Sequence, residues 1–167
     1  MRRLALSVLV VTAAMAGVAA VDVTAAGQAT TTISLISGNA RESVTDKAPK
    51  ELARGVASRG DVIRGTSVLR NAVRQFGKPS GAIVGRDSYS FRFVSPTEAV
   101  IAVKVVLPGG TLTARGRMRV SQGDRIAVTV TGGTGKFAGA RGTGEAARAL
   151  SPNESLNVYR LRFPETA

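Results

Sequence analysis

The sequence contains no cysteine, no histidine and no tryptophan, and aromatic residues make up only 4% of the chain. Without cysteine the chain can form no disulfide framework and carries no lipid-modified N-terminal cysteine. The scarcity of aromatic side chains leaves little for bases to stack on, which argues against a nucleic-acid-binding protein. Any core must therefore be built mainly from Val, Ile, Leu and Ala.

Acidic residues are also few relative to basic ones. The 23 Lys and Arg outnumber the 11 Asp and Glu, which gives a formal net charge of +12. The basic residues are dispersed over the whole chain instead of being clustered in one segment, and this again disfavours nucleic acid as the partner. We interpret them as a solvated basic surface, in contact with anionic cell-wall polymers.

The N-terminus has the pattern of an export signal. Arg2 and Arg3 are followed by an uncharged run, 4–21, and small residues then mark sites for a signal peptidase. A membrane anchor is the alternative, but alanine, glycine, serine and threonine dilute the run and no basic cluster follows it. We expect residues 1–29 to form a signal peptide helix. After its cleavage we expect a secreted protein with no stable membrane span. The candidate cleavage sites follow Ala20, Ala26 and Ala29.

The rest of the chain divides into residues 30–60, a first strand with a flexible arm, and a β-rich domain over 61–167. The arm combines glycine, asparagine, proline and charged residues, and is expected to hold at most one helical turn near 51–56. Alternating apolar residues between turn residues predict the strands. Their expected bounds are 31–37, 61–70, 80–94, 98–107, 111–121, 124–131, 141–150 and 155–163.

These segments predict an all-β protein, because no long helical period separates the strands and parallel βαβ units are therefore disfavoured. An eight-stranded antiparallel β-barrel is favoured over a sandwich, since closure removes the sheet edges that invite aggregation. The segment 111–121 illustrates the expected sidedness. Arg115, Arg117 and Arg119 share one face with threonines, and burying them would be costly, so that face must lie outside.

The segment 128–142 runs from a strand into a glycine-dense turn built around Phe137. The glycines permit positive φ and close backbone approach. Phe137 is costly to leave in water and is expected to plug one end of the core. The same glycines formally match a dinucleotide-binding pattern, but no helix can begin in so glycine-rich a segment, so nucleotide binding is not expected.

Four blocks of residues resemble the successive signatures of dirigent proteins and the related allene oxide cyclase-like barrels. The glycine-rich turn with its phenylalanine and the Ala-Arg-Gly that follows is the most specific of them. The resemblance covers about residues 61–163. The four blocks are Gly77-Lys78-Pro79-Ser80-Gly81, Pro108 to Leu112 before Arg115-Gly116, Thr131 to Phe137 with Ala140-Arg141-Gly142, and Leu156-Asn157-Val158-Tyr159.

This resemblance implies an eight-stranded antiparallel barrel around an apolar lumen that binds a small hydrophobic metabolite and steers its cyclisation or stereoselective coupling. It implies an isomerase or cyclase of secondary metabolism, or a stereo-directing auxiliary protein, and assembly as a homodimer or homotrimer. No metal or organic cofactor is expected, which agrees with the lack of His and Cys. A non-catalytic small-ligand carrier or a cell-wall-associated structural barrel is the alternative.

If the barrel is catalytic, its polar groups are those that strand alternation directs inward. Asp87 and Tyr89 share the apolar face of their strand, so Asp87 is a candidate general acid and Tyr89 a candidate hydrogen-bond donor. The resemblance places Arg141 at the cavity rim, able to counter the charge of Asp87; a structural Asp87–Arg141 pair is the alternative. The candidate substrate-binding residues are Phe91, Phe93, Met118, Asn157 and Tyr159.

Overall fold

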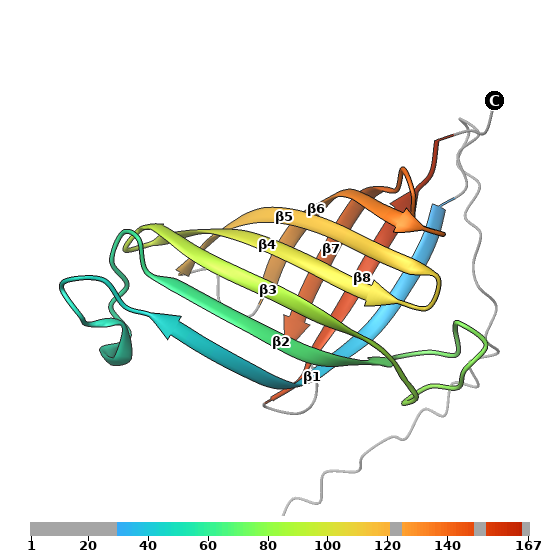
Figure 1. Ribbon diagram of the computed structural model, residues 1–167, viewed down its shortest axis with the longest axis horizontal. Coiled ribbons are helices and arrows are strands. Elements are labelled where there is room, and N and C mark those ends of the chain that lie inside the picture. Colours follow the sequence, from blue (N-terminus) through green and yellow to red (C-terminus); the bar gives the residue numbers. More distant parts are fainter. Residues whose placement is uncertain (1–29, 121–124, 149–152, 165–167) are drawn as a thin grey trace, which may run out of the picture.

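The computed structural model describes residues 30–120, 125–148 and 153–164, and these form a closed β-barrel (Figure 1). The signal peptide expected over 1–29 lies outside the described residues. The strands are β1 (Thr30–Thr45), β2 (Val62–Asn71), β3 (Ile83–Ser95), β4 (Glu98–Leu107), β5 (Gly110–Arg119), β6 (Arg125–Gly135), β7 (Arg141–Arg148) and β8 (Ser155–Arg162), with a short 3₁₀ helix η1 (Leu52–Arg54) between β1 and β2.

Each strand pairs antiparallel with the next, and β8 pairs with β1 to close the sheet. The closing pair runs in register from Thr30 opposite Arg162 to Ser37 opposite Ser155. The predicted eight-stranded antiparallel barrel is therefore confirmed. Because side chains alternate along each strand, every strand presents one set of residues to the interior and another to solvent.

The first strand is longer than its sequence pattern predicts, since β1 continues through residues 38–45 to pair with β2. A bulge between Gly38 and Arg41 makes this continuation possible, and Asn39 takes a φ of 55° within it. The expected helical turn is present as η1. Within the described ranges, no helix is both long and apolar enough to cross a membrane.

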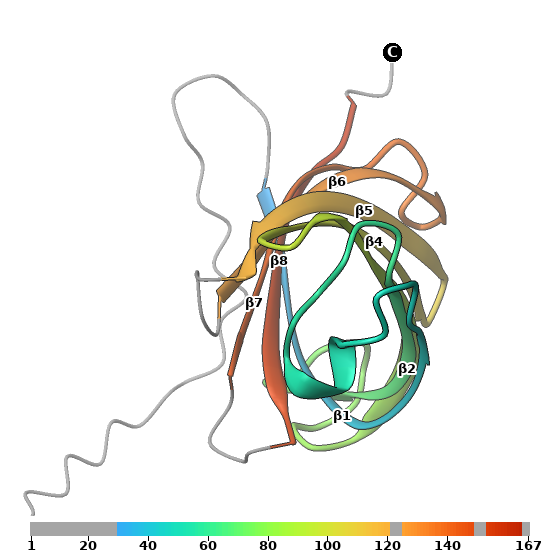
Figure 2. The same cartoon turned by 90° about the vertical axis from the view of Figure 1, so that its left-hand side faces the viewer.

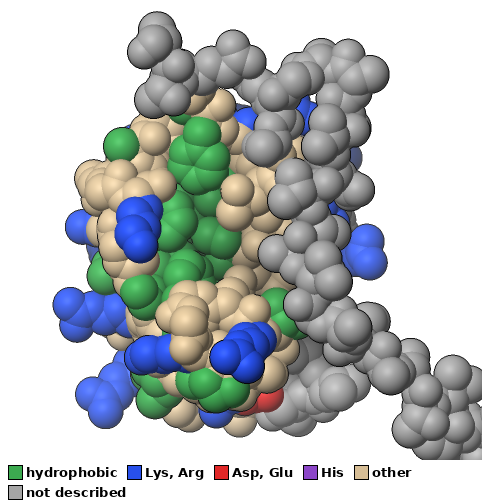
Figure 3. Space-filling model, turned by 90° about the vertical axis from the view of Figure 1, so that its right-hand side faces the viewer, with side chains coloured by type: hydrophobic (Ala, Val, Ile, Leu, Met, Phe, Trp, Pro, Cys, Tyr) green, Lys and Arg blue, Asp and Glu red, His purple; other side chains and the backbone are tan. Residues whose placement is uncertain are grey.

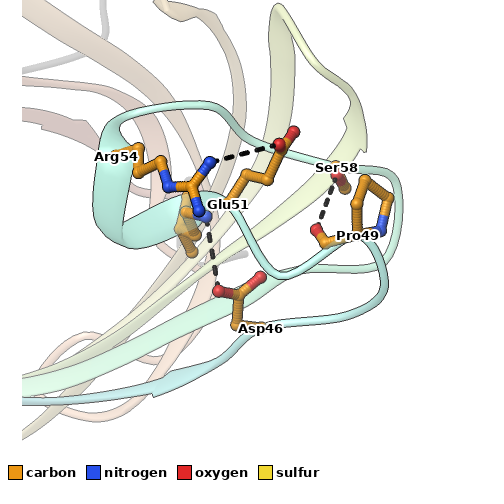
Figure 4. Close-up of polar contacts among 6 residues, drawn as sticks. Asp46, Pro49, Glu51, Arg54 and Ser58 are labelled. Carbon is orange, nitrogen blue, oxygen red and sulfur yellow. Dashed lines mark hydrogen bonds and ion pairs between the residues drawn. The ribbon is translucent and has the colours of Figure 1, made fainter.

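The loop between β1 and β2 is fixed by its own polar contacts. The carboxylate of Asp61 is fully buried and accepts hydrogen bonds from the backbone N–H groups of Lys47 and Ser58, each at 2.7 Å. Asp46 accepts from the backbone N–H of Leu52, and Glu51 pairs with Arg54 (Figure 4). The loop lies beyond one end of the barrel in Figure 1, and Figure 2 shows η1 in front of that opening.

The opposite end of the barrel is packed with apolar side chains. Phe137, predicted to plug one end of the core, is only 6% exposed and packs among leucines and valines from the surrounding strands. The turn that carries it depends on Gly135, whose φ is 59° and where a Cβ would come within 2.1 Å of the carbonyl oxygen of Gly109. Figure 3 shows this end, with hydrophobic side chains gathered in the middle of the face.

The outer face carries the charge. Arg115, Arg117 and Arg119 are all exposed, as the alternation of β5 predicts, while Leu112 and Ala114 on the opposite face of the strand are buried. The interior therefore contains no arginine from β5, and the closed sheet separates a basic exterior from an apolar interior.

Removing the Phe137 ring tests how much the packed end contributes to stability. We expect Phe137→Ala to lower the free energy of unfolding by about 3 to 5 kcal/mol, because it leaves a cavity among side chains that cannot collapse into it. Ile83→Ala serves as the control, because Ile83 is 62% exposed and its loss should cost less than about 1 kcal/mol. Urea unfolding monitored by circular dichroism measures both. Equal losses in the two variants would contradict this role for Phe137.

Candidate small-molecule site

A cavity of about 240 Å³ lies inside the barrel, in the half that faces the β1–β2 loop. It is larger than the roughly 150 Å³ engineered cavity that holds one benzene ring. The cavity exists because several inward positions in this half carry small side chains, including Ala40, Ser67 and Ala146. The interior is thus filled at one end and hollow at the other.

The cavity has one polar wall and one apolar wall. The polar wall comes from four neighbouring strands, β8, β1, β2 and β3. The opposite wall comes from β4 and β6 and is purely aliphatic. The polar wall contains Asn157, Tyr159, Ser37, Ser67, Asp87 and Tyr89, and the aliphatic wall contains Ile101, Val103, Ile126 and Val128.

Asp87 lies at the centre of the polar wall and is 7% exposed. Its Oδ1 accepts a hydrogen bond from the backbone N–H of Ser67 at 3.0 Å, and its Oδ2 accepts one from the hydroxyl of Ser37 at 3.3 Å. Burial raises the pKa of Asp87 above its ordinary value, and these hydrogen bonds, which favour the charged form, oppose that rise only in part. The carboxyl group therefore keeps its proton to a higher pH than an exposed aspartate does.

Tyr89 reaches across a neighbouring strand to an acidic side chain. Glu42, Gly65 and Tyr89 are paired in one register row across β1, β2 and β3. A Cβ at Gly65 would come within 2.3 Å of the tyrosine ring, so glycine at this position is what allows the ring to lie over β2. The Tyr89 hydroxyl donates to Oε1 of Glu42 at 2.5 Å. Burial, followed by this hydrogen bond, raises the pKa of Tyr89, so the hydroxyl stays protonated.

Two further polar groups of the wall are available to a guest molecule. Asn157 and Tyr159 are 7% and 5% exposed and line the cavity. Among the described residues, neither side chain has a hydrogen-bond partner. Burial, with a smaller contribution from the charge of Asp87, raises the pKa of Tyr159, so its hydroxyl is a donor. An unpaired buried donor favours a ligand that carries an acceptor oxygen or nitrogen.

The structure brings together most of the candidate residues but not all of them. Asp87, Tyr89, Phe91, Asn157 and Tyr159 all line the cavity. The ring of Phe91 meets that of Tyr89 edge to face, with centroids 5.6 Å apart, and so helps to fix its position.

Three candidates lie elsewhere. Arg141 is exposed at the start of β7, at the packed end of the barrel, and its guanidinium donates to the carbonyl oxygen of Ala140. The expected contact between Arg141 and Asp87 is not formed, because Asp87 is bound by Ser37 and Ser67 instead. Phe93 and Met118 are half-buried but are not among the residues that line the cavity.

Three cavity residues were missed in the sequence. Ser37 and Ser67 follow the inward alternation of Leu35 and Leu69 and could have been found by extending that pattern. Glu42 could not have been found in this way. The bulge after Gly38 changes which residues of β1 face inward, and it lies in a segment expected to be a flexible arm.

This arrangement supports a definite chemistry. The aliphatic wall can hold an apolar skeleton in one conformer, while the hydroxyl of Tyr159 offers a hydrogen bond to its oxygen atoms and Asp87 offers one when it is protonated. The Tyr89 hydroxyl, held by Glu42, adds a further polar group to this wall. The cavity can therefore bind, orient and polarise a small, mostly apolar molecule.

Comparison with known proteins shows where else this fold occurs. No family model and no curated protein sequence matches the chain. Among solved structures, the pterocarpan synthase dirigent protein GePTS1 matches with a TM-score of 0.62 at 13% identity, covering 90% of this chain and 100% of that one. A pyocyanin demethylase matches with a TM-score of 0.60 at 20% identity, covering 78% and 98%.

The exo-specific intermolecular Diels-Alderase AbnU matches with a TM-score of 0.55 at 14% identity, covering 79% of this chain and 98% of that one. Likeness at such low identity establishes the fold. The chain therefore has the barrel fold of dirigent and allene oxide cyclase-like proteins, as its four sequence blocks predicted.

Proposed function

We propose that this protein binds a small hydrophobic metabolite in the barrel cavity and steers its cyclisation or stereoselective coupling. The observation that carries the proposal is the hollow half of the barrel, where an aliphatic wall faces a wall of buried polar groups. A barrel with a purely structural role has no reason to leave this half unfilled, since filling it would add stability.

Steering requires little chemistry from the protein. A flexible substrate loses conformational entropy when it folds towards ring closure, and a preformed cavity supplies that folded conformer in advance. In this barrel the β4 and β6 side chains hold the apolar skeleton. Tyr159, and Asp87 in its protonated form, then donate hydrogen bonds to a carbonyl or phenol oxygen whose negative charge grows as the new bond forms.

The fold neighbours support this reading of the cavity. They include a dirigent protein described as a pterocarpan synthase and a protein described as an exo-specific intermolecular Diels-Alderase. The substrates of those proteins are not assigned to this chain. What this chain shares with them is the barrel, and we infer the class of activity from the barrel together with the two walls of its cavity.

We further propose that the protein is exported and acts outside the cytoplasm, which the signal-like residues 1–29 support. The intact mass of protein recovered from outside the cells tests this. It should correspond to a chain that begins at residue 21, 27 or 30. Retention of the uncut chain inside the cells would contradict export.

Filling the cavity tests ligand binding without touching a polar group. Val103 lines the cavity, whereas Ala102 next to it is exposed on the outer face of the same strand. We expect Val103→Phe to reduce the amount of metabolite that co-purifies with the protein by about tenfold, because the added ring occupies the space of the guest. Ala102→Phe adds the same ring outside and should leave retention unchanged. Native mass spectrometry measures the retained metabolites.

The two possible failures of this test have different meanings. Equal retention by both variants would place the ligand outside the cavity and overturn the proposal. If the metabolite is retained and then released without chemical change, the protein is a carrier and does not catalyse cyclisation or coupling.

The raised pKa of Asp87 predicts a particular pH dependence of stability. The unfolded chain releases this proton near pH ~3.9 but the folded chain only at a higher pH, so folding becomes less favourable as the pH rises between the two values. Asp87→Asn keeps the shape but does not titrate; its Oδ1 can still accept from the backbone N–H of Ser67, while its Nδ2 can only donate to the Ser37 hydroxyl. The stability of Asp87→Asn relative to the native chain should therefore increase with pH across that window, by about 1.4 kcal/mol for each unit of raised pKa.

Urea unfolding of the two proteins between pH 3 and pH 8 measures this difference. Any fixed cost of the substitution appears as a constant offset at the lowest pH. Parallel stability profiles over the whole range would show that burial does not keep the carboxyl group protonated.

A further inference from the structure

The outer face of β1 to β5 carries a second depression, separate from the interior cavity. It is a shallow groove of about 750 Å³ on the solvent side of the sheet, here called the outer trough. Its floor is formed by the short side chains of Thr66, Ser88 and Ser90, and its sides by basic residues. Strong twist and coiling of the strands leave such a surface concave along the strand direction.

The strand register sets the cations at regular positions around the trough. One row across the sheet reads Arg41, Thr66, Ser88, Lys104 from β1 to β4. The next row reads Arg64, Ser90, Ala102, Arg115 from β2 to β5. In both rows a cation stands at each end and two short side chains lie between. Three strand spacings separate the cations of each row, which is about 14 Å.

The trough is also bounded along its length. Arg86 and Arg92 lie on the same outer face of β3, on either side of Ser88 and Ser90. They are six residues apart, or about 20 Å along the strand. Four exposed cations therefore line the trough, and two more, Arg86 and Arg92, lie on the same face of β3 beyond its lining residues.

These cations have no anionic partners within the described part of the chain. None of the six forms an ion pair there; the ion pairs found involve Arg54, Arg70, Arg119 and Arg160. Glu42 is the one acidic residue that lines the trough, and its carboxylate already accepts the Tyr89 hydroxyl. Six like charges around one depression repel each other and favour an anionic occupant.

We propose that the outer trough binds a linear, polyhydroxylated anionic polymer, a carbohydrate or polyol chain that carries uronate or phosphate groups. Arginine and lysine pair with its anionic groups. The serine and threonine hydroxyls of the floor exchange hydrogen bonds with its hydroxyls.

The shape and chemistry of the trough argue against other occupants. Tyr89 is the one aromatic residue among those that line the trough, and its ring lies against Gly65 with its hydroxyl bound to Glu42, so no row of free rings is available for bases to stack on, which disfavours single-stranded nucleic acid. The trough is recessed, and Ala102 is the one exposed apolar side chain among the residues that line it, so a flat bilayer finds little apolar surface to contact there. A second copy of the chain would bring its own excess of positive charge to the same place.

Paired double variants test the location. Arg64→Gln with Arg115→Gln removes one cation from each side of the trough. Arg125→Gln with Arg162→Gln removes the same charge from exposed positions outside it. Binding of the purified chain to polygalacturonate and to poly(glycerol phosphate) is measured by calorimetry at two salt concentrations. We expect the trough variant to raise the dissociation constant at least about tenfold for the polymer that binds, and the control variant less than about threefold.

The choice of polymer tests the chemical class. The two polymers distinguish uronate from phosphate as the anionic group. Inorganic polyphosphate, single-stranded DNA and phosphatidylglycerol vesicles serve as anions without a matching polyol chain, and each should bind at least about tenfold more weakly. Equal losses in the two double variants, or equal binding of polyphosphate, would overturn the proposal. Retention of the cavity metabolite should be the same in every variant, so this test is independent of the proposed function.

Discussion

Closure of the sheet, completed by the pairing of β1 with β8, is the constraint on which the rest of this structure depends. A closed sheet gives every side chain one of two environments, and the chain uses them for different purposes. Phe137 and the leucines around it fill one end of the interior and supply the apolar burial that holds the barrel together. That packing allows the other end to remain hollow.

The hollow end costs stability, because it buries polar groups and leaves space unfilled. The structure limits this cost locally. Asp87 is held by Ser37 and Ser67, and Tyr89 lies over Gly65 to reach Glu42, so these two groups find partners through the register of adjacent strands. Among the residues that the structure describes, the side chains of Asn157 and Tyr159 have no such partner. They face the cavity, where a ligand can form the missing hydrogen bonds.

Much of this could be predicted from the sequence, because alternation along a strand determines which face a residue occupies. It placed Asp87 and Tyr89 inside and the arginines of β5 outside. Alternation does not determine how far along the barrel a residue lies, so it could not test the position near Asp87 that the family resemblance implied for Arg141, which lies at the packed end. It also fails at irregularities, and the bulge in β1 hid Glu42.

The central claim is that one half of the barrel interior is an open apolar cavity that accepts a guest. A crystal structure determined under xenon pressure tests it most directly, because xenon enters dry apolar cavities of this size without requiring a polar partner. We predict xenon density between Val103 and Val128, in contact with the aliphatic wall. A xenon-free interior in which side chains fill that space would contradict the account.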